Sequence, residues 1–114
     1  MKKTDPLGQL EQVVLTAVLV LRDQAYGMAV HARVIELAER PVKLPAVYVT
    51  LERLEEKGYL SSRLSDPTPE RGGRAKRIYR LTPAGDRVLN ESADTAGRVY
   101  DAVKGFGKWK PSRA

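Results

Sequence analysis

Two different spacings of apolar residues divide this chain into helical segments and a short alternating segment. From position 7 to 21 apolar residues recur at three- and four-residue steps, the spacing of a helix with one buried face. This face comprises Leu7, Leu10, Val13, Val14, Ala17, Val18 and Leu21. Asp5 and Pro6 precede it as an N-cap residue and a first-turn proline, so we expect the first helix to begin there.

Two further helices are expected before the spacing changes. The second extends from about Tyr26-Gly27 to Glu39, after a break at 22–24 and before Arg40-Pro41. It is expected to bury Val30, Val34, Leu37 and Ala38. The third begins at Pro45, buries Val47, Leu51 and Leu54, and is capped by Gly58. Its opposite face is expected to carry small or basic groups, which suit the floor of a DNA groove: Ala46, Val49, Thr50, Arg53 and Lys57.

A β-hairpin with a basic loop follows the third helix. Side chains alternate from Tyr59 to Leu64 and again from Lys76 to Leu81, which predicts two strands. The segment 65–74 between them holds two prolines and two glycines, so we expect a loop. Arg71 and Arg74 lie on either side of a Gly-Gly pair that allows a partner to approach the backbone closely. The base of the hairpin adds Arg63, Lys76, Arg77 and Arg80.

A final helix begins at Thr82-Pro83 and extends to about Lys104. Its apolar residues fall at alternating four- and three-residue steps, a heptad-like spacing that suits packing against another helix. We call this set the α-stripe; it comprises Leu89, Ala93, Ala96, Tyr100 and Val103. The expected organisation is a winged helix-turn-helix over 5–82, a dimerisation helix over 83–107, and a disordered tail over 108–114. The fold class is mainly α with one small β-hairpin.

Composition and charge limit the kinds of partner that this protein is expected to bind. The 114 residues are 42% apolar and 30% charged, which is enough for one core. The net charge of +6 favours an acidic partner such as nucleic acid. The longest apolar run, Val13 to Leu21, is too short to cross a bilayer, and the absence of cysteine fits the cytoplasm. We therefore expect a cytoplasmic protein without a membrane segment.

Four segments resemble the PadR-type regulators. Residues 7–11, 25–27 and 46–60 are similar to successive signatures of that family, and residues 70–85 are similar to its wing-to-last-helix signature. The resemblance covers about residues 7 to 90 and is closest to the short subgroup with one C-terminal helix. The chain has Ala46 where the family commonly has glycine, and Val49 where it commonly has proline. The resemblance implies a homodimeric repressor or activator whose last helix contacts the partner, often at the partner's first helix.

The site residues expected from these patterns form two groups. The DNA-binding group is Ala46, Tyr48, Val49, Thr50, Arg53, Lys57, Arg71, Gly72, Gly73, Arg74 and Lys76. The dimer-interface group is Leu10, Val14, Leu89, Ala93, Ala96, Tyr100, Val103 and Phe106. Within them we expect Thr50 and Arg53 near base edges, and Arg71 and Arg74 near phosphate or the minor groove.

Several residues have two interpretations. Tyr48 either packs laterally or donates to a phosphate, and the loop arginines are either solvated or DNA contacts. Phe106 and Trp109 either cap the core or cover the dimer contact or, as the resemblance to ligand-responsive members of the family implies, line a pocket for a small hydrophobic or aromatic effector. We take Tyr26 as structural and His31 as a packed or exposed histidine. The sequence offers no partner residues for a metal site at His31, so neither metal nor cofactor is expected.

Three classes of function were compared. An enzyme is disfavoured because no nucleophile and base, phosphate loop or metal cluster can be assembled from these residues. The leading hypothesis is a sequence-specific DNA-binding regulator, a repressor acting as a homodimer. The alternative is a winged-helix module that binds protein rather than DNA, for which an apolar recognition face is expected. RNA binding is less favoured because an aromatic platform for stacked bases is missing.

Overall fold

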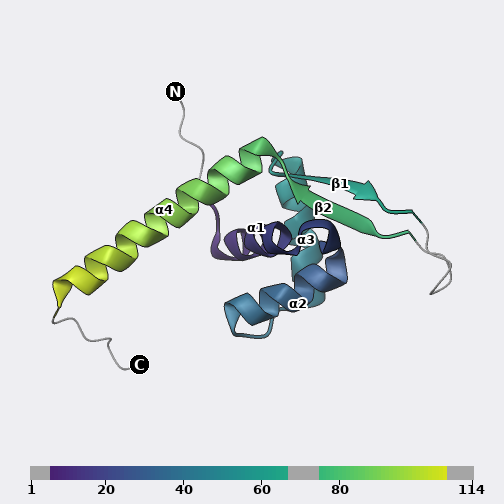
Figure 1. The fold of residues 1–114 in the computed structure, drawn as a ribbon. Helices are drawn as coiled ribbons and strands as arrows, with labels where there is room; N and C mark the ends of the chain where they lie inside the picture. The colour runs from purple at the N-terminus through teal and green to yellow at the C-terminus, as the bar shows by residue number, and fades with distance from the viewer. Residues whose placement is uncertain (1–5, 67–74, 108–114) are drawn as a thin grey trace.

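Three helices, an antiparallel hairpin and one long helix follow one another along the chain (Figure 1). The structure, a computed structural model, describes residues 6–66 and 75–107. The helices of the first half are α1 (Gln9–Leu21), the single 3₁₀ turn η1 (Arg22–Gln24), α2 (Gly27–Ala38) and α3 (Leu44–Glu56). The hairpin strands are β1 (Leu60–Leu64) and β2 (Arg77–Leu81), and α4 is Pro83–Phe106. The predicted fold class is confirmed.

The core forms where α1, α2, α3 and the base of the hairpin meet. Its fully buried side chains include Leu15 from α1, Val30 and Val34 from α2, and Val47, Leu51 and Leu54 from α3. The predicted buried faces of α1 and α3 supply most of it, but Leu15 lies outside the set expected for α1. Leu37, which we expected to be buried, is 43% exposed, so that prediction is wrong.

The start of α1 lies later than the sequence indicates. Pro6 and Leu7 are not helical, and Gly8 is the N-cap residue. The reason is a local cap: the Glu11 side chain reaches back and accepts the N–H of Gly8 at 2.9 Å. A glutamate at the third helical position satisfies one of the N–H groups that a helix start leaves without a partner. This contact fixes the first turn at Gly8, and a helix start at Asp5-Pro6 is therefore wrong.

The hairpin is joined to the α1–α2 connection by backbone contacts. Strands β1 and β2 pair antiparallel, with Leu60 opposite Leu81 and Ser62 opposite Tyr79. On the other edge of β2, Tyr26 forms an isolated bridge with Ile78, and the N–H of Tyr79 donates to the carbonyl of Ala25 at 2.9 Å. The connection thus acts as a third, very short strand. It fixes the orientation of the hairpin relative to the helices.

The end of α3 and the start of α4 are held together at one junction. Gly58 has φ +82°, a conformation that favours glycine, and turns the chain from α3 into β1. Thr82 caps α4 by accepting the N–H of Gly85, and its hydroxyl donates to the Gly58 carbonyl at 2.6 Å. The Thr82 N–H donates to the carbonyl of Tyr59. Residues 58–59 are therefore connected to the N-cap of α4 through both the side chain and the backbone of Thr82.

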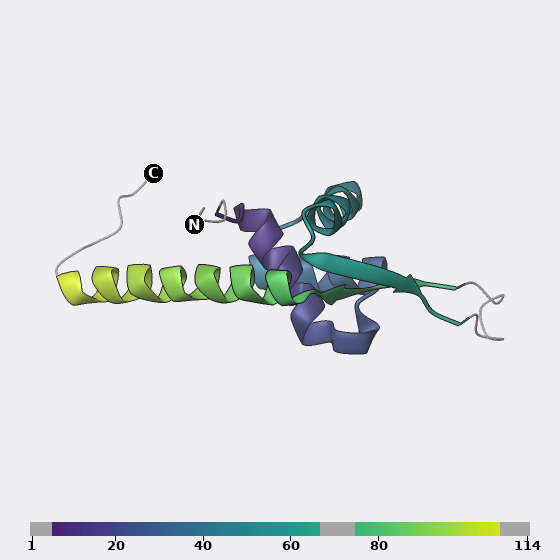
Figure 2. The ribbon, with the colours of Figure 1, turned by 90° about the horizontal axis from the view of Figure 1, so that it is seen from above.

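Helix α4 leaves the body on the side away from the hairpin, as Figures 1 and 2 both show. Its 24 residues make a rod about 36 Å long. Only Gly85, Val88 and Leu89 near its start are buried. The remaining two thirds of the helix therefore have no cover from the described part of the chain.

Candidate nucleic-acid interface

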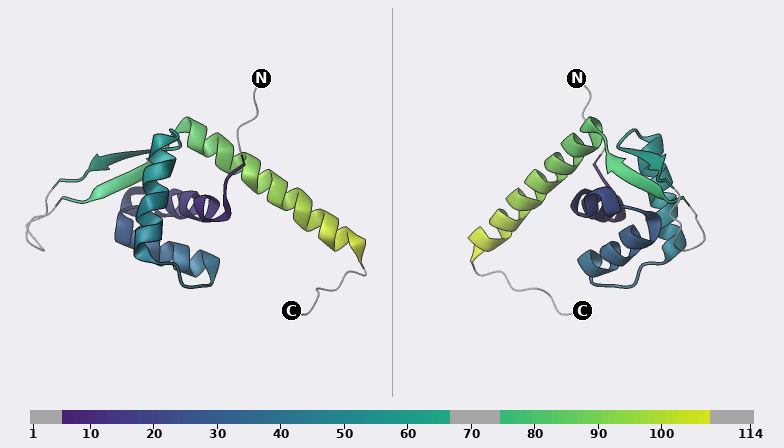
Figure 3. Two further views of the ribbon diagram at one scale, coloured as in Figure 1. Left: turned by 180° about the vertical axis from the view of Figure 1, so that it is seen from behind. Right: turned by 45° about the vertical axis from the view of Figure 1, so that its right-hand side comes forward.

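Helix α3 follows α2 in the position of a recognition helix, and its outer face is uncovered. Seen from behind, α3 is the foremost element and nothing is drawn over it (Figure 3, left). Tyr48, Val49 and Arg53 are exposed there, whereas Ala46 is half-buried. Ala46, Val49 and Arg53 were expected at this face, and Tyr48 was expected among the DNA-binding residues. Val49 lies on the uncovered side of α3 with Tyr48 and Arg53 on either flank, and Ala46 lies at its edge.

Thr50 is not on this face. It is only 7% exposed, and its hydroxyl donates to the Ala46 carbonyl at 2.7 Å, one turn earlier in α3. A hydroxyl bonded in this way enters a core at small cost, because its hydrogen bond is satisfied. The placement of Thr50 on the outer face is therefore wrong. The sequence contained an indication of this burial, because Thr50 lies three residues after buried Val47 and four residues before buried Leu54.

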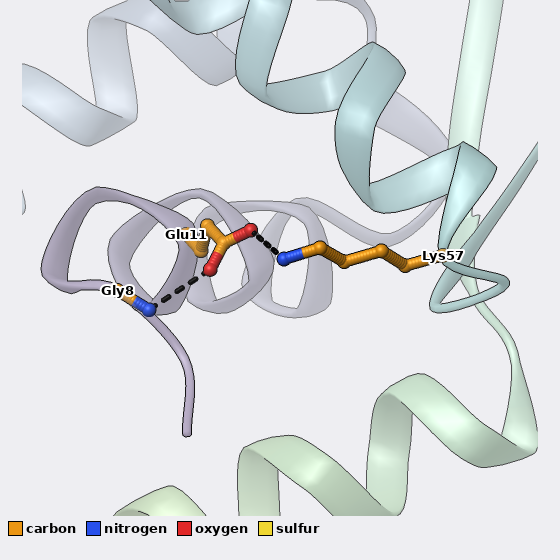
Figure 4. Close-up of polar contacts among 3 residues, drawn as sticks. All are labelled: Gly8, Glu11 and Lys57. Carbon is orange, nitrogen blue, oxygen red and sulfur yellow. Dashed lines mark hydrogen bonds and ion pairs between the residues drawn. The ribbon is translucent and has the colours of Figure 1, made fainter. Parts of the chain in front are cut away.

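Lys57 is exposed but already has an ionic partner. Its Nζ lies 2.7 Å from Oε2 of Glu11, while Oε1 of Glu11 accepts from Gly8 (Figure 4). Partial burial acts to raise the pKa of the Glu11 carboxyl, but the hydrogen bonds from Lys57 and Gly8 outweigh it, so the pKa is lowered overall. A phosphate contact by Lys57 would compete with this pair.

Tyr48 packs laterally against α2. A Cβ added at Gly27 would collide with the phenol ring and hydroxyl of Tyr48, so the ring lies directly over the first residue of α2. Tyr48 is nevertheless 39% exposed. The structure thus shows the packing contact, while a contact from Tyr48 to phosphate stays a prediction.

Basic side chains lie along both strands of the hairpin and next to its loop. Arg63, Arg77 and Arg80 are exposed, and Lys76 is half-buried with its ammonium 4.0 Å from the centre of the Tyr26 ring. This cation–π contact gives Tyr26 the structural role expected for it and holds Lys76 close to the body.

A chain of two hydrogen bonds connects the hairpin to α3. The Arg77 guanidinium donates to the hydroxyl of Ser62 at 2.9 Å, and that hydroxyl donates to Oε2 of Glu55 at 2.7 Å. Neither Arg77 nor Ser62 stood among the expected site residues, although the strand register brings both to the face of the hairpin that carries buried Tyr79. These two hydrogen bonds fix the orientation of the hairpin relative to α3.

Tyr79 lies opposite Ser62 on the same face of the hairpin. Burial raises the pKa of its hydroxyl, so this group is neutral.

The loop of the hairpin lies outside the described residues. Arg71, Gly72, Gly73 and Arg74 belong to it. Their roles in DNA binding remain predictions. The expected tail at 108–114, including Trp109, likewise lies outside the described residues.

The exposed part of α4 carries the α-stripe. Ala93, Ala96, Tyr100 and Val103 are all exposed, with Tyr100 at 62%. Val99 and Phe106 flank them, at 58% and 67% exposed; Val99 was missed because it stands outside the heptad-like spacing. Leu89 is buried against the core, and Val14 has no exposed surface at all. The assignment of Val14 to the dimer interface is therefore wrong, because a partner cannot reach it. Leu10, assigned to the same interface, is half-buried.

An open groove of about 600 Å³ lies between the end of α1, the hairpin and the start of α4. Its lining combines apolar Leu19 and Ile78 with charged Arg22, Asp23 and Arg80. Phe106, expected at a ligand pocket, is not part of this lining. The groove and the expected pocket are therefore different places.

His31 has a structural contact: its Nε2 lies 2.6 Å from the Val42 carbonyl, which ties α2 to the segment before α3. Within residues 6–66 and 75–107, no three His, Asp or Glu side chains gather in a way that could hold a metal ion. No helix of these same ranges combines the length and apolar character needed to cross a membrane.

Three helices, with α2 and α3 as the helix pair and a β-hairpin beside α3, define a winged helix-turn-helix protein. The family model of the PadR-like transcriptional regulators matches residues 17–91, which is more than half of the chain. The chain belongs to the PadR-like family of transcriptional regulators, as the sequence resemblance predicted. Comparison with curated proteins gave no match.

Solved structures of PadR regulators share the fold. A PadR family transcription regulator from Clostridium difficile is 20% identical with a TM-score of 0.68, and the match covers 87% of this chain and 98% of that one. A PadR-like regulator from Bacillus cereus is 19% identical with a TM-score of 0.68, covering 89% and 97%. One from Eggerthella lenta is 26% identical with a TM-score of 0.66, covering 87% and 84%.

Proposed function

We propose that this regulator binds specific sequences of duplex DNA as a homodimer and represses transcription. The observation that carries the proposal is the uncovered face of α3 with a basic hairpin fixed beside it by the Arg77–Ser62–Glu55 chain. A helix of this kind enters the major groove, while a flanking hairpin reaches the backbone or the minor groove. The net charge of +6 supports an anionic partner.

The contacts divide by chemistry. The first turns of α3 offer Ala46, Tyr48 and Val49, and Arg53 follows one turn later; these face the base edges in our proposal. Phosphates are contacted by the hairpin in our proposal, through Lys76 and Arg77 beside the loop and the segment 71–74 within it. Phosphate contacts set the affinity and its salt dependence, whereas contacts to base edges set the sequence preference.

The homodimer is supported by the exposed α-stripe on α4. A soluble helix that presents Tyr100, Val103 and Phe106 to water, at 62%, 43% and 67% exposure, gains free energy when a second helix covers them. A two-fold dimer would also supply two copies of α3 for two half-sites. Half-burial of Leu10 leaves it available for the same contact.

Repression follows when a bound dimer covers a promoter and excludes the polymerase. An apolar or aromatic effector near Phe106, at the centre of the dimer, would change the relation between the two copies of α3. We propose the cytoplasm as the compartment, since that is where a bacterial-type regulator meets its DNA. A reporter gene behind the selected operator, with and without this protein, tests the sign of regulation.

The experiment that tests DNA binding combines selection with salt dependence. Purified protein is mixed with random-sequence duplexes, bound duplexes are enriched, and the affinity for the enriched and starting pools is measured at several salt concentrations. Specific binding predicts enrichment of a two-part site and a log-affinity that falls by about 0.9 per phosphate contact for each unit of log salt. No enrichment and no salt dependence would favour the protein-interaction module instead, for which exposed Tyr48 and Val49 offer an apolar contact.

A further inference from the structure

The stripe of α3 that points away from the core carries an acidic residue at its centre. Val49, Glu52 and Glu56 follow one another at steps of three and four residues, so they share one side of the helix. All three are exposed, and they lie opposite the buried Val47, Leu51 and Leu54. Arg53 stands beside this stripe rather than on it.

Two other glutamates of the same region are engaged with protein partners, whereas Glu56, like Glu52, has none among the residues that the structure describes. Glu55 accepts from Ser62, and Glu11 accepts from Lys57 and Gly8. Glu52 makes neither a hydrogen bond nor an ion pair with any residue that the structure describes. No contact within the described fold therefore explains why a glutamate occupies position 52.

An acidic side chain inside a major groove has few acceptable neighbours. The phosphates on both sides repel it, and guanine and thymine present only acceptor atoms there, at N7 and O6 or at O4. The amino groups of cytosine and adenine are the donors that the base edges offer. Adenine places the acceptor N7 next to its amino group, whereas cytosine has only carbon beside N4, so a carboxylate is best matched by cytosine.

We infer that Glu52 is a specificity-determining residue that accepts a hydrogen bond from the amino group of a cytosine in each half-site. The inference rests on the proposed function, because it needs α3 in the major groove. Val49 lies one turn closer to the start of α3, where its methyl groups suit the methyl group of a thymine. Glu56 lies about 6 Å further along the helix axis, beyond the N-terminal part that meets the bases.

The role of Glu52 is as much exclusion as attraction. Guanine and thymine bring only acceptor atoms toward the carboxylate, and each such encounter buries a charge without a partner, while adenine places its acceptor N7 beside its amino group. Random DNA is therefore disfavoured at this position. Glu52 lowers the affinity for non-specific duplexes while it fixes one base of the operator.

Selection from random duplexes with matched variants tests this inference. The wild-type protein should select a recurring cytosine in each half-site. Glu52→Gln should lose it or replace it by adenine, because an amide side chain pairs with the N6 and N7 of adenine. The preference for cytosine over the other bases, measured on duplexes that differ at that position, should fall by about fivefold or more. Glu56→Gln removes the same charge from the same face and should keep the wild-type preference.

Two outcomes would overturn the inference. One leaves the proposed function intact, and the other contradicts the proposed function as well. If Glu52→Gln binds DNA with unchanged base preference at every position, Glu52 does not read a base, and the proposed function stands. If the wild-type protein fails to enrich any sequence, both the proposed function and this inference fall. Circular dichroism of the two variants checks the fold, which we expect to be intact because the change is conservative and both side chains are exposed.

Discussion

The carboxylate of Glu11 and the ammonium of Lys57 lie 2.7 Å apart, although 46 positions separate them in the sequence. The pair joins the first turn of α1 to the residue that ends α3. Because the Glu11 side chain is 16% exposed and that of Lys57 48% exposed, water screens the interaction, and we expect it to contribute no more than about 1 kcal/mol.

This pair predicts a specific dependence of stability on pH. The lowered pKa of Glu11 in the folded protein means that its contribution is complete above the ordinary value of 4.5 and is lost as pH falls through the folded pKa. Glu11→Gln should therefore be less stable than wild type at neutral pH and should approach it in acid. Urea unfolding at neutral pH and at about pH 3 measures this difference. Glu36→Gln, which alters an exposed pair with Arg33, is the control and should show little pH-dependent difference.

Gly85 is expected to tolerate no side chain. A Cβ at this position would collide with the backbone carbonyl of Tyr59, which cannot move aside without breaking its bond from Thr82. Gly85→Ala should reduce the free energy of unfolding by about 1–3 kcal/mol or more. Gly97→Ala is the control: the space around it is open, and alanine should stabilise α4 by up to about 1 kcal/mol. Equal stability of the two variants in thermal unfolding would contradict the close contact.

The proposed dimer contact can be tested with one substitution at two places. Ala96 and Ala102 are both exposed on α4, but Ala96 lies on the α-stripe and Ala102 faces a different side of the helix. Ala96→Asp should shift the protein from dimer to monomer in sedimentation velocity, because a charge would be buried between apolar helices. Ala102→Asp carries the same cost in helix propensity and should remain dimeric. A dimer that persists in Ala96→Asp would remove the α-stripe as the interface, and dissociation of both variants would extend the contact around α4 beyond the α-stripe.

Arg53 is expected to contact a base edge. Arg53→Ala should weaken operator binding by about 1–3 kcal/mol and relax the preference at one position of each half-site. Arg98→Ala removes the same charge from exposed α4 and should leave the preference unchanged. A loss of equal size on operator and random duplexes would make Arg53 a phosphate contact instead.

The loop arginines are expected to act through phosphate. Arg71→Ala or Arg74→Ala should flatten the slope of log affinity against log salt by about 1 for each phosphate that the dimer no longer neutralises. Preference for the operator over random DNA should largely survive, since a phosphate carries no direct sequence information. If the double variant keeps the wild-type slope, the loop does not touch DNA.

The sequence predicts the elements well where one spacing dominates. Buried Val47, Leu51 and Leu54 fix the inner side of α3, and the glycine at 58 marks its end. The sequence predicts burial and helix boundaries less well where a single polar contact determines them. Thr50 is buried because its hydroxyl donates to the Ala46 carbonyl, and α1 begins at Gln9, after the N-cap Gly8, because Glu11 accepts the N–H of Gly8. The cap by Glu11 leaves no mark in the apolar pattern, and the burial of Thr50 is marked only by its spacing from Val47 and Leu54.

The charged contacts of the site were the least predictable part. The sequence shows Lys57 as a free basic residue, but its partner Glu11 comes from the far end of the domain. Likewise, the link from Arg77 through Ser62 to Glu55 depends on the strand register and on how the hairpin stands against α3. Such long-range pairings follow from packing, which a local pattern does not contain.

The junction of residues 58–59 with the first turn of α4 has a mechanical consequence. Hydrogen bonds from Thr82 and the close contact at Gly85 leave no hinge between the end of α3 and the rod formed by α4. A rotation of α4 therefore moves α3 with it, because the two helices behave as one rigid body. In the proposed dimer, with α4 of each copy at the contact, the crossing angle of the two α4 helices would affect the distance between the two α3 helices. A change of a few degrees at the crossing then becomes a displacement of ångströms at the DNA.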